Sequence, residues 1–155
     1  MKKFLTLSLT LALVLGVLAK PKKVVMIAGK QSHGPLSHEH KAGIMLLAKC
    51  LKEGASKLVA PTVVLNGWPE DNGVFDGADA VVIYRDGGGR HPALGGNNLE
   101  ILGKLMDKGV GFLTIHYAVE PTTNKGNKEF IKWQGGCFET HWSVNPHWVA
   151  NFKKL

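Results

Sequence analysis

Three of the seven histidines of this chain lie close together in one polar stretch. The stretch KQSHGPLSHEHKAG, residues 30–43, holds His33, His38 and His40, with Glu39 between the last two. Neutral imidazoles are good ligands for zinc and similar ions, and a histidine also serves as a general acid or base near neutral pH. The stretch therefore predicts a metal site, a polar substrate pocket or, with no chemistry, a polar loop that caps the next helix.

Two later segments carry residues of related chemistry. One reads DGGGRH and begins at Asp86, and in the other His116 directly follows an apolar run. A glycine-rich turn frees backbone N–H groups to hold an oxyanion or a sugar hydroxyl, so Asp86, Gly87 and Gly88 are candidate substrate-binding residues. A tight turn without a ligand is the alternative for that segment. For His116 the alternative is a buried histidine whose hydrogen bonds are satisfied.

The elements that must position these residues predict an open α/β sheet. Four short runs are nearly continuous in apolar residues, as in strands buried on both faces: residues 24–27, 62–65, 80–84 and 110–115. Apolar residues at three- and four-residue spacing predict helices over residues 40–53, from Asn97 or Asn98 to the glycine at 109, and over 129–133. This order predicts a mostly parallel sheet that is covered by helices on both faces.

The polar segments follow the strands of this predicted sheet. In open parallel sheets, ligands bind beyond the carboxyl ends of the strands. The loop from His33 to His40 follows the first strand, the segment that begins at Asp86 follows the third, and His116 follows the fourth. We therefore expect the histidines to meet at one edge, with His116 and Glu39 as candidate catalytic residues. The candidate metal ligands from this argument are His33, His38, His40 and His116.

The last part of the chain is rich in tryptophan and histidine. The segment ETHWSVNPHW, residues 139–148, contains two Trp–His neighbours, which favours a wall on which a sugar stacks. Trp142 and Trp148 would form that wall, and plain aromatic packing on the sheet is the alternative. Cys137 is a candidate nucleophile of a cysteine hydrolase, although nothing in the sequence marks its thiolate as stabilised.

The first residues have the pattern of a secretory signal peptide. Lys2 and Lys3 precede a mostly apolar segment, and small residues stand before position 20. We expect residues 1–19 to be removed and residues 20–155 to be exported to the periplasm or secreted, without stable membrane insertion. The formal net charge of +7 includes those two lysines, and no basic-aromatic stripe indicates nucleic-acid binding. Cys50 and Cys137 either form one disulfide or stay free, with Cys50 buried on the apolar side of its helix.

Four motifs together resemble a known family. They are KVVMIAGKQSHGPLSHEHKAG, GADAVVIYRDGGG, GVGFLTIHYAVE and GGCFETHWSVNPHW, and in this order they are similar to the ThuA-like (trehalose utilisation) family. The resemblance implies a flavodoxin-like sheet of the class I glutamine amidotransferase-like superfamily, and a role in the use of disaccharides or their keto derivatives. The amidotransferases of that superfamily carry a cysteine nucleophile at the turn where this chain has His116, so a thiolate-based glutaminase is disfavoured.

The resemblance also adds His141 as a metal ligand, because the family pattern has a second histidine after a Gly-Gly-x-Phe segment. A metal-assisted enzyme acting on a small-molecule sugar, with a divalent metal such as zinc, is then the first functional hypothesis, and a non-catalytic carbohydrate-binding module is the second. Members of the family run longer than this chain. We therefore expect the ThuA-like domain over residues 20–155 to lack its C-terminal part.

Overall fold

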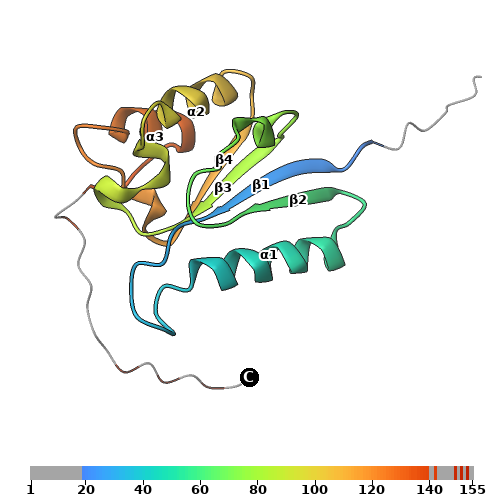
Figure 1. The fold of residues 1–155 in the computed structure, drawn as a ribbon, viewed down its shortest axis with the longest axis horizontal. Helices are drawn as coiled ribbons and strands as arrows, with labels where there is room; N and C mark the ends of the chain where they lie inside the picture. The colour runs from blue at the N-terminus through green and yellow to red at the C-terminus, as the bar shows by residue number, and fades with distance from the viewer. Residues whose placement is uncertain (1–18, 140–141, 143–148, 150, 152, 154–155) are drawn as a thin grey trace, which may run out of the picture.

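In the described part of the chain, four parallel strands form the centre of the protein. The computed structural model describes residues 19–139 together with residues 142, 149, 151 and 153. The strands are β1 (Lys22–Ala28), β2 (Val59–Val64), β3 (Ala80–Tyr84) and β4 (Gly111–Ile115). They lie in the order β2-β1-β3-β4, and every neighbouring pair is parallel (Figure 1). This α/β architecture confirms the predicted parallel sheet and is compatible with a flavodoxin-like fold.

Helices cover both faces of the sheet. Helix α1 (His40–Gly54) lies on one side, while α2 (Asn98–Met106) and α3 (Asn127–Gln134) lie on the other (Figure 1). Within the described ranges, four short 3₁₀ helices complete the connections: η1 (Asn72–Phe75), η2 (Gly88–Arg90), η3 (Pro92–Leu94) and η4 (His116–Val119). The three predicted helices are confirmed, because their apolar spacing is the one that a half-buried helix needs.

The core has two halves because side chains alternate across a strand. Met26 and Ala28 of β1 face α1, where they meet Ile44 and Ala48. The alternate residues Val25 and Ile27 face the other side and belong to the cluster that contains Leu102 of α2 and Phe130 of α3. The sheet is thus held from both sides, which leaves the loops at its carboxyl edge free to carry a site.

Two expectations from the sequence are wrong in detail. Strand β4 is not buried on both faces: it is an edge strand among the described residues, and Leu113 is 54% exposed because α1 packs on β1, β2 and β3. Cys50 is exposed rather than buried, since the buried line of α1 runs through Ile44 and Ala48 on another face. Neither Cys50 nor Cys137 forms a disulfide.

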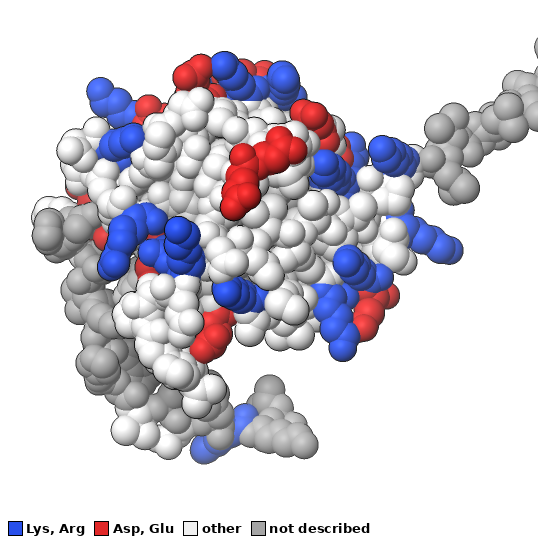
Figure 2. Space-filling view, viewed as in Figure 1, with Lys and Arg blue, Asp and Glu red and all other residues white. Residues whose placement is uncertain are grey.

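The surface carries both signs of charge. Figure 2 shows Lys and Arg side chains around the visible face, with Asp and Glu side chains between them. In the described part of the chain, no helix has the length and apolar character needed to cross a membrane. The predicted signal peptide lies outside the described residues, except for Ala19.

Candidate functional site

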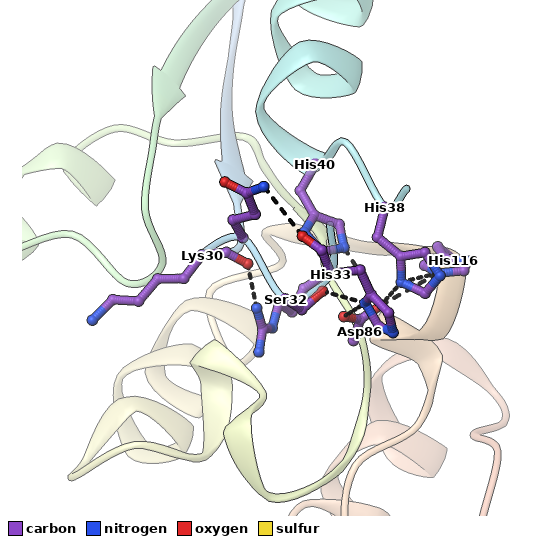
Figure 3. Close-up of polar contacts among 9 residues, drawn as sticks. Lys30, Ser32, His33, His38, His40, Asp86 and His116 are labelled. Atoms are coloured by element: carbon purple, nitrogen blue, oxygen red, sulfur yellow. Dashed lines mark hydrogen bonds and ion pairs between the residues drawn. The ribbon is translucent and has the colours of Figure 1, made fainter. Parts of the chain in front are cut away.

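The loops that follow β1, β3 and β4 meet at one edge of the sheet. Ala28, the last residue of β1, pairs with Tyr84, and Tyr84 pairs with Ile115, so three strands end at the same level. The histidine loop, Asp86 and His116 start from these strand ends. Figure 3 shows their side chains pointing toward one another. The predicted convergence of His33, His38, His40 and His116 is confirmed.

The carboxylate of Asp86 is the centre of this cluster. Its Oδ1 atom lies 2.6 Å from His38 Nδ1, 3.4 Å from His116 Nε2 and 3.5 Å from His40 Nε2. Its Oδ2 atom lies 3.6 Å from His33 Nδ1. The rings also contact each other: His116 Nε2 is 3.5 Å from His38 Nδ1, and the centroids of the His33 and His38 rings are 3.8 Å apart. Four imidazoles from two separate segments therefore share one carboxylate.

Two of these histidines have a backbone conformation that L-residues rarely adopt. The φ angle is 52° at His38 and 62° at His116, in the left-handed region. Such residues cost roughly 1–3 kcal/mol each and persist where the surrounding structure enforces them, often at functional sites. At His116 this conformation begins η4 directly after β4 and turns the chain sharply at the edge of the sheet.

Gly43 allows the close packing that surrounds the buried His40. A Cβ atom at Gly43 would lie 2.4 Å from Cε1 of Tyr84, so only glycine lets α1 approach this ring so closely. The Tyr84 ring in turn packs edge-on against His40, with a centroid distance of 5.1 Å. The His40 side chain is only 1% exposed, and neither of its ring nitrogens makes a hydrogen bond to the described residues.

The electrostatics keep the carboxylate charged. Burial on its own raises the pKa of Asp86, but hydrogen bonds from Ser32 and His38, and the positive charges that His38 and His40 carry once they are protonated at low pH, outweigh it and lower the pKa from 3.8 to about 2. Asp86 is thus ionised throughout the neutral range.

The same surroundings keep two of the rings neutral. Burial lowers the pKa of His40 and of His116 below the usual 6.5, although the carboxylate of Asp86 works in the opposite direction. Neutral imidazole is the form that ligates metals and accepts protons.

His33, His38 and Asp86 could hold a metal ion, since one donor atom from each lies within 4.8 Å of the others. Tetrahedral ligands 2.0–2.1 Å from zinc stand about 3.3 Å from each other. Asp86 Oδ2 lies 3.6 Å from His33 Nδ1, close to that value, while Asp86 Oδ1 lies 2.6 Å from His38 Nδ1 and would have to move apart from it to hold zinc. Two imidazoles and one carboxylate also match the donor set of open zinc sites. The buried ring nitrogens of His40 beside this group make no hydrogen bond among the described residues, although Nε2 lies 3.5 Å from Asp86 Oδ1, which is consistent with an additional ligand.

A cavity of about 460 Å³ opens beside the cluster. It lies between the histidine loop and η4, and its lining includes His33, His38, Asp86, Tyr117 and Glu120. This volume falls in the range of small-molecule sites. The cavity could therefore bring a small polar ligand into contact with the rings.

The other predicted site residues take different positions. Glu39 is exposed, and its carboxylate accepts a hydrogen bond from the Leu36 N–H at 2.8 Å, so its catalytic role stays a prediction. The predicted oxyanion cradle is wrong at Gly88, because its N–H already donates to the Glu120 carbonyl at 2.8 Å. Gly87 is needed for packing, since a Cβ there would lie 2.6 Å from the Tyr117 and Glu120 carbonyl oxygens.

The candidates in the last segment are only partly described. Trp142 is 75% exposed. The predicted metal ligand His141 and the second tryptophan of the stacking wall, Trp148, lie outside the described residues. Burial raises the pKa of the Cys137 thiol, and the nearby Glu139 adds to the effect, so this residue is mostly protonated at neutral pH and is a poor nucleophile.

Sequence reasoning missed two features of this edge. Asp86 was expected to bind substrate, whereas the structure makes it the common partner of the histidines; its position just after β3 was the available signal. His91, from the same segment, is a structural residue. It is 2% exposed, its Nε2 donates to the Ala118 carbonyl, and its Nδ1 accepts from the Ala93 N–H, each at 3.0 Å.

The site must be interpreted from its own chemistry. No protein-family model, curated protein or solved structure matches this chain.

Proposed function

We propose that this chain is an exported, ThuA-like protein of carbohydrate utilisation that works as a metal-assisted enzyme on a disaccharide or keto-sugar. The observation that carries the proposal is the gathering of four imidazoles around the ionised carboxylate of Asp86. Resemblance in sequence to the ThuA-like family supports the sugar substrate and the flavodoxin-like fold of the amidotransferase-like superfamily. The sharp turn at His116, directly after β4, is where that resemblance expects a histidine.

In this proposal His33, His38 and Asp86 hold a divalent ion, zinc in the first instance, and His141 remains a further predicted ligand. When bound, such an ion polarises a sugar carbonyl or lowers the pKa of a water molecule. The residues of the chain supply orientation and proton transfer. His38 Nδ1 and Asp86 Oδ1 already lie 2.6 Å apart, so these two proposed ligands are held side by side.

His116 is the proposed general base. Burial lowers its pKa, so the ring is neutral and can accept a proton at neutral pH. A proton accepted at Nε2 would be held between His116 and Asp86 Oδ1, which are 3.4 Å apart, and the carboxylate would stabilise the resulting imidazolium. Tyr117 and Glu120 line the adjoining cavity and offer hydrogen-bonding groups to sugar hydroxyls.

Metal stoichiometry is the first test. The purified chain is loaded with zinc, dialysed and measured by elemental analysis, beside Asp86→Asn and the control Asp107→Asn, an exposed acid that pairs with Lys132. We expect one zinc per chain in the parent and the control, and a loss of affinity of about tenfold or more in Asp86→Asn, because a charged ligand is lost. Absence of zinc from the parent, or equal zinc in all three proteins, would contradict the proposal.

Turnover is the second test. Trehalose and its keto derivatives are incubated with the zinc-loaded chain and followed by NMR. Products should appear with the parent and the Asp107→Asn control, and disappear in His116→Ala. Equal turnover by His116→Ala would remove this residue from the mechanism.

A carbohydrate-binding module without turnover is the alternative, and the 75% exposure of Trp142 favours it. Exposed aromatic rings offer sugars a flat apolar surface. In that case sugar binding should survive metal removal and Asp86→Asn, and should be lost in Trp142→Ala. Sugar binding measured with and without metal therefore separates the two functions.

A further inference from the structure

A second cavity lies beside the histidine site. It has a volume of about 450 Å³ and is formed by the segments that follow β1, β2 and β3. Arg85 and Arg90 line both this cavity and the one beside the histidine cluster, so the two are neighbours. None of the four histidines around Asp86 lines this second cavity.

The lining of this cavity is basic. Lys30, Arg85 and Arg90 contribute to it, and no aspartate or glutamate is among the described residues that line it. Figure 3 shows the Lys30 side chain pointing away from the histidine cluster. His91 adds no charge at neutral pH, because burial lowers its pKa to about 4. The cavity therefore presents three positive side chains and no negative one.

Arg85 is the unusual member of this set, because its charge is buried. Arg85 is only 5% exposed, and its Nη1 donates a hydrogen bond to the Lys30 carbonyl. The buried Nε atom has no hydrogen-bond partner among the described residues, and no described carboxylate lies within ion-pair distance of the guanidinium. Buried charges are normally paired, because an uncompensated charge inside a protein is strongly destabilising.

The glycine at position 29 is also required by the side chain of Arg85. A Cβ atom at Gly29 would lie 2.0 Å from Arg85 Cδ, so only glycine leaves room for the arginine stem. The next residue, Asp86, does not serve as a counter-ion in this cavity, because its carboxylate is directed to the histidines. A buried, under-partnered guanidinium at the wall of a basic cavity is what an anion-binding site requires.

We propose that this second cavity binds an oxyanion, the carboxylate or phosphate group of a small ligand, through Arg85, Arg90 and Lys30. The planar fork of an arginine can bind two oxygens of either group at once, and Lys30 adds a point charge. The half-buried ring of Trp68 also lines the cavity and gives an apolar surface to the rest of the ligand. This site stands on its own residues and does not require a metal in the neighbouring cluster.

Isothermal titration calorimetry on the metal-stripped full chain, with the chelator removed, tests this site. The probes are inorganic phosphate, gluconate as a carboxylate, and glucitol as the neutral counterpart of gluconate. We expect at least one anion to bind once per chain and glucitol not to bind. Binding of phosphate but not of gluconate would identify a phosphoryl ligand, and binding of gluconate but not of phosphate would identify a carboxylate. Lys30→Gln and Arg90→Gln should each weaken binding by about tenfold, since a charge-assisted hydrogen bond is lost.

The control is Lys52→Gln, which makes the same change of net charge in the exposed last turn of α1 and should leave binding unchanged. Lys30 and Arg90 are both exposed, so their replacement does not endanger folding. Failure of both anions to bind would overturn the proposal, as would equal binding by the two cavity variants and the control. Zinc binding is measured separately, so this site and the proposed enzyme can fail independently.

Discussion

The buried, neutral state of His91 makes the stability of the protein depend on pH in a predictable way. Burial lowers the pKa of this ring from 6.5 to about 4 in the folded protein. Between these values the unfolded chain binds a proton at His91 and the folded protein does not, so stability is complete above pH 6.5 and falls as the pH falls toward 4. One pKa unit corresponds to about 1.4 kcal/mol, so the full effect is about 3 kcal/mol.

A change from about pH 7 to about pH 5 covers most of this range. The unfolding free energy should then fall by about 2 kcal/mol through His91 alone. The assay is urea unfolding, followed by circular dichroism, of the parent and of His91→Gln at both pH values. Glutamine keeps a donor and an acceptor but cannot titrate, so its own drop should be smaller by that amount. Other histidines titrate in both proteins and cancel in the comparison.

The result that would refute this reasoning is an equal drop for the parent and His91→Gln. It would mean that His91 is protonated as easily in the folded protein as in the unfolded chain. A lower stability of His91→Gln at both pH values is expected, because the bonds to Ala118 and Ala93 change, and it does not bear on the difference.

Three further measurements test the packing of the protein. Gly29→Ala should lower the unfolding free energy by about 2 kcal/mol or more in urea unfolding, because its Cβ would overlap Arg85 Cδ at 2.0 Å; unchanged stability would contradict this close approach. His116→Gly should be more stable than His116→Ala by about 1 kcal/mol, since φ is 62° there, and the opposite order would contradict the left-handed turn. Titration with a thiol reagent should count two free thiols, Cys50 reacting first because it is exposed and Cys137 slowly because burial raises its pKa; equal rates would argue against this difference.

The fold was largely predictable because its signals are local. Continuous apolar runs indicated the four strands, and three- to four-residue spacing indicated α1 and α2 to within a few residues. The errors came from neighbours that a local pattern does not contain. Leu113 belongs to an apolar run but lies on an edge strand that α1 does not cover. Cys50 lies on a different face of α1 from the buried residues of that helix.

The site was predictable as a place and less so as a set of contacts. Parallel strands must end at one edge, so His33–His40, Asp86 and His116 could be expected to meet there. Their individual roles could not, since a 2.6 Å contact between His38 and Asp86 depends on loop conformations with positive φ that no periodic pattern encodes. The same holds for Gly88, whose N–H is taken by a carbonyl 32 residues away in sequence, that of Glu120.

Residue order alone therefore determined the layered α/β sheet and the edge at which the histidines gather, because hydrophobic periodicity and strand direction are properties of the chain. Only the tertiary structure decided that Asp86 is their shared partner, that His91 is a buried structural ring, and that Arg85 is a buried cation beside a second cavity. Those facts arise from burial and from contacts between distant segments, and burial is what sets the cost of a charge or an unmade hydrogen bond.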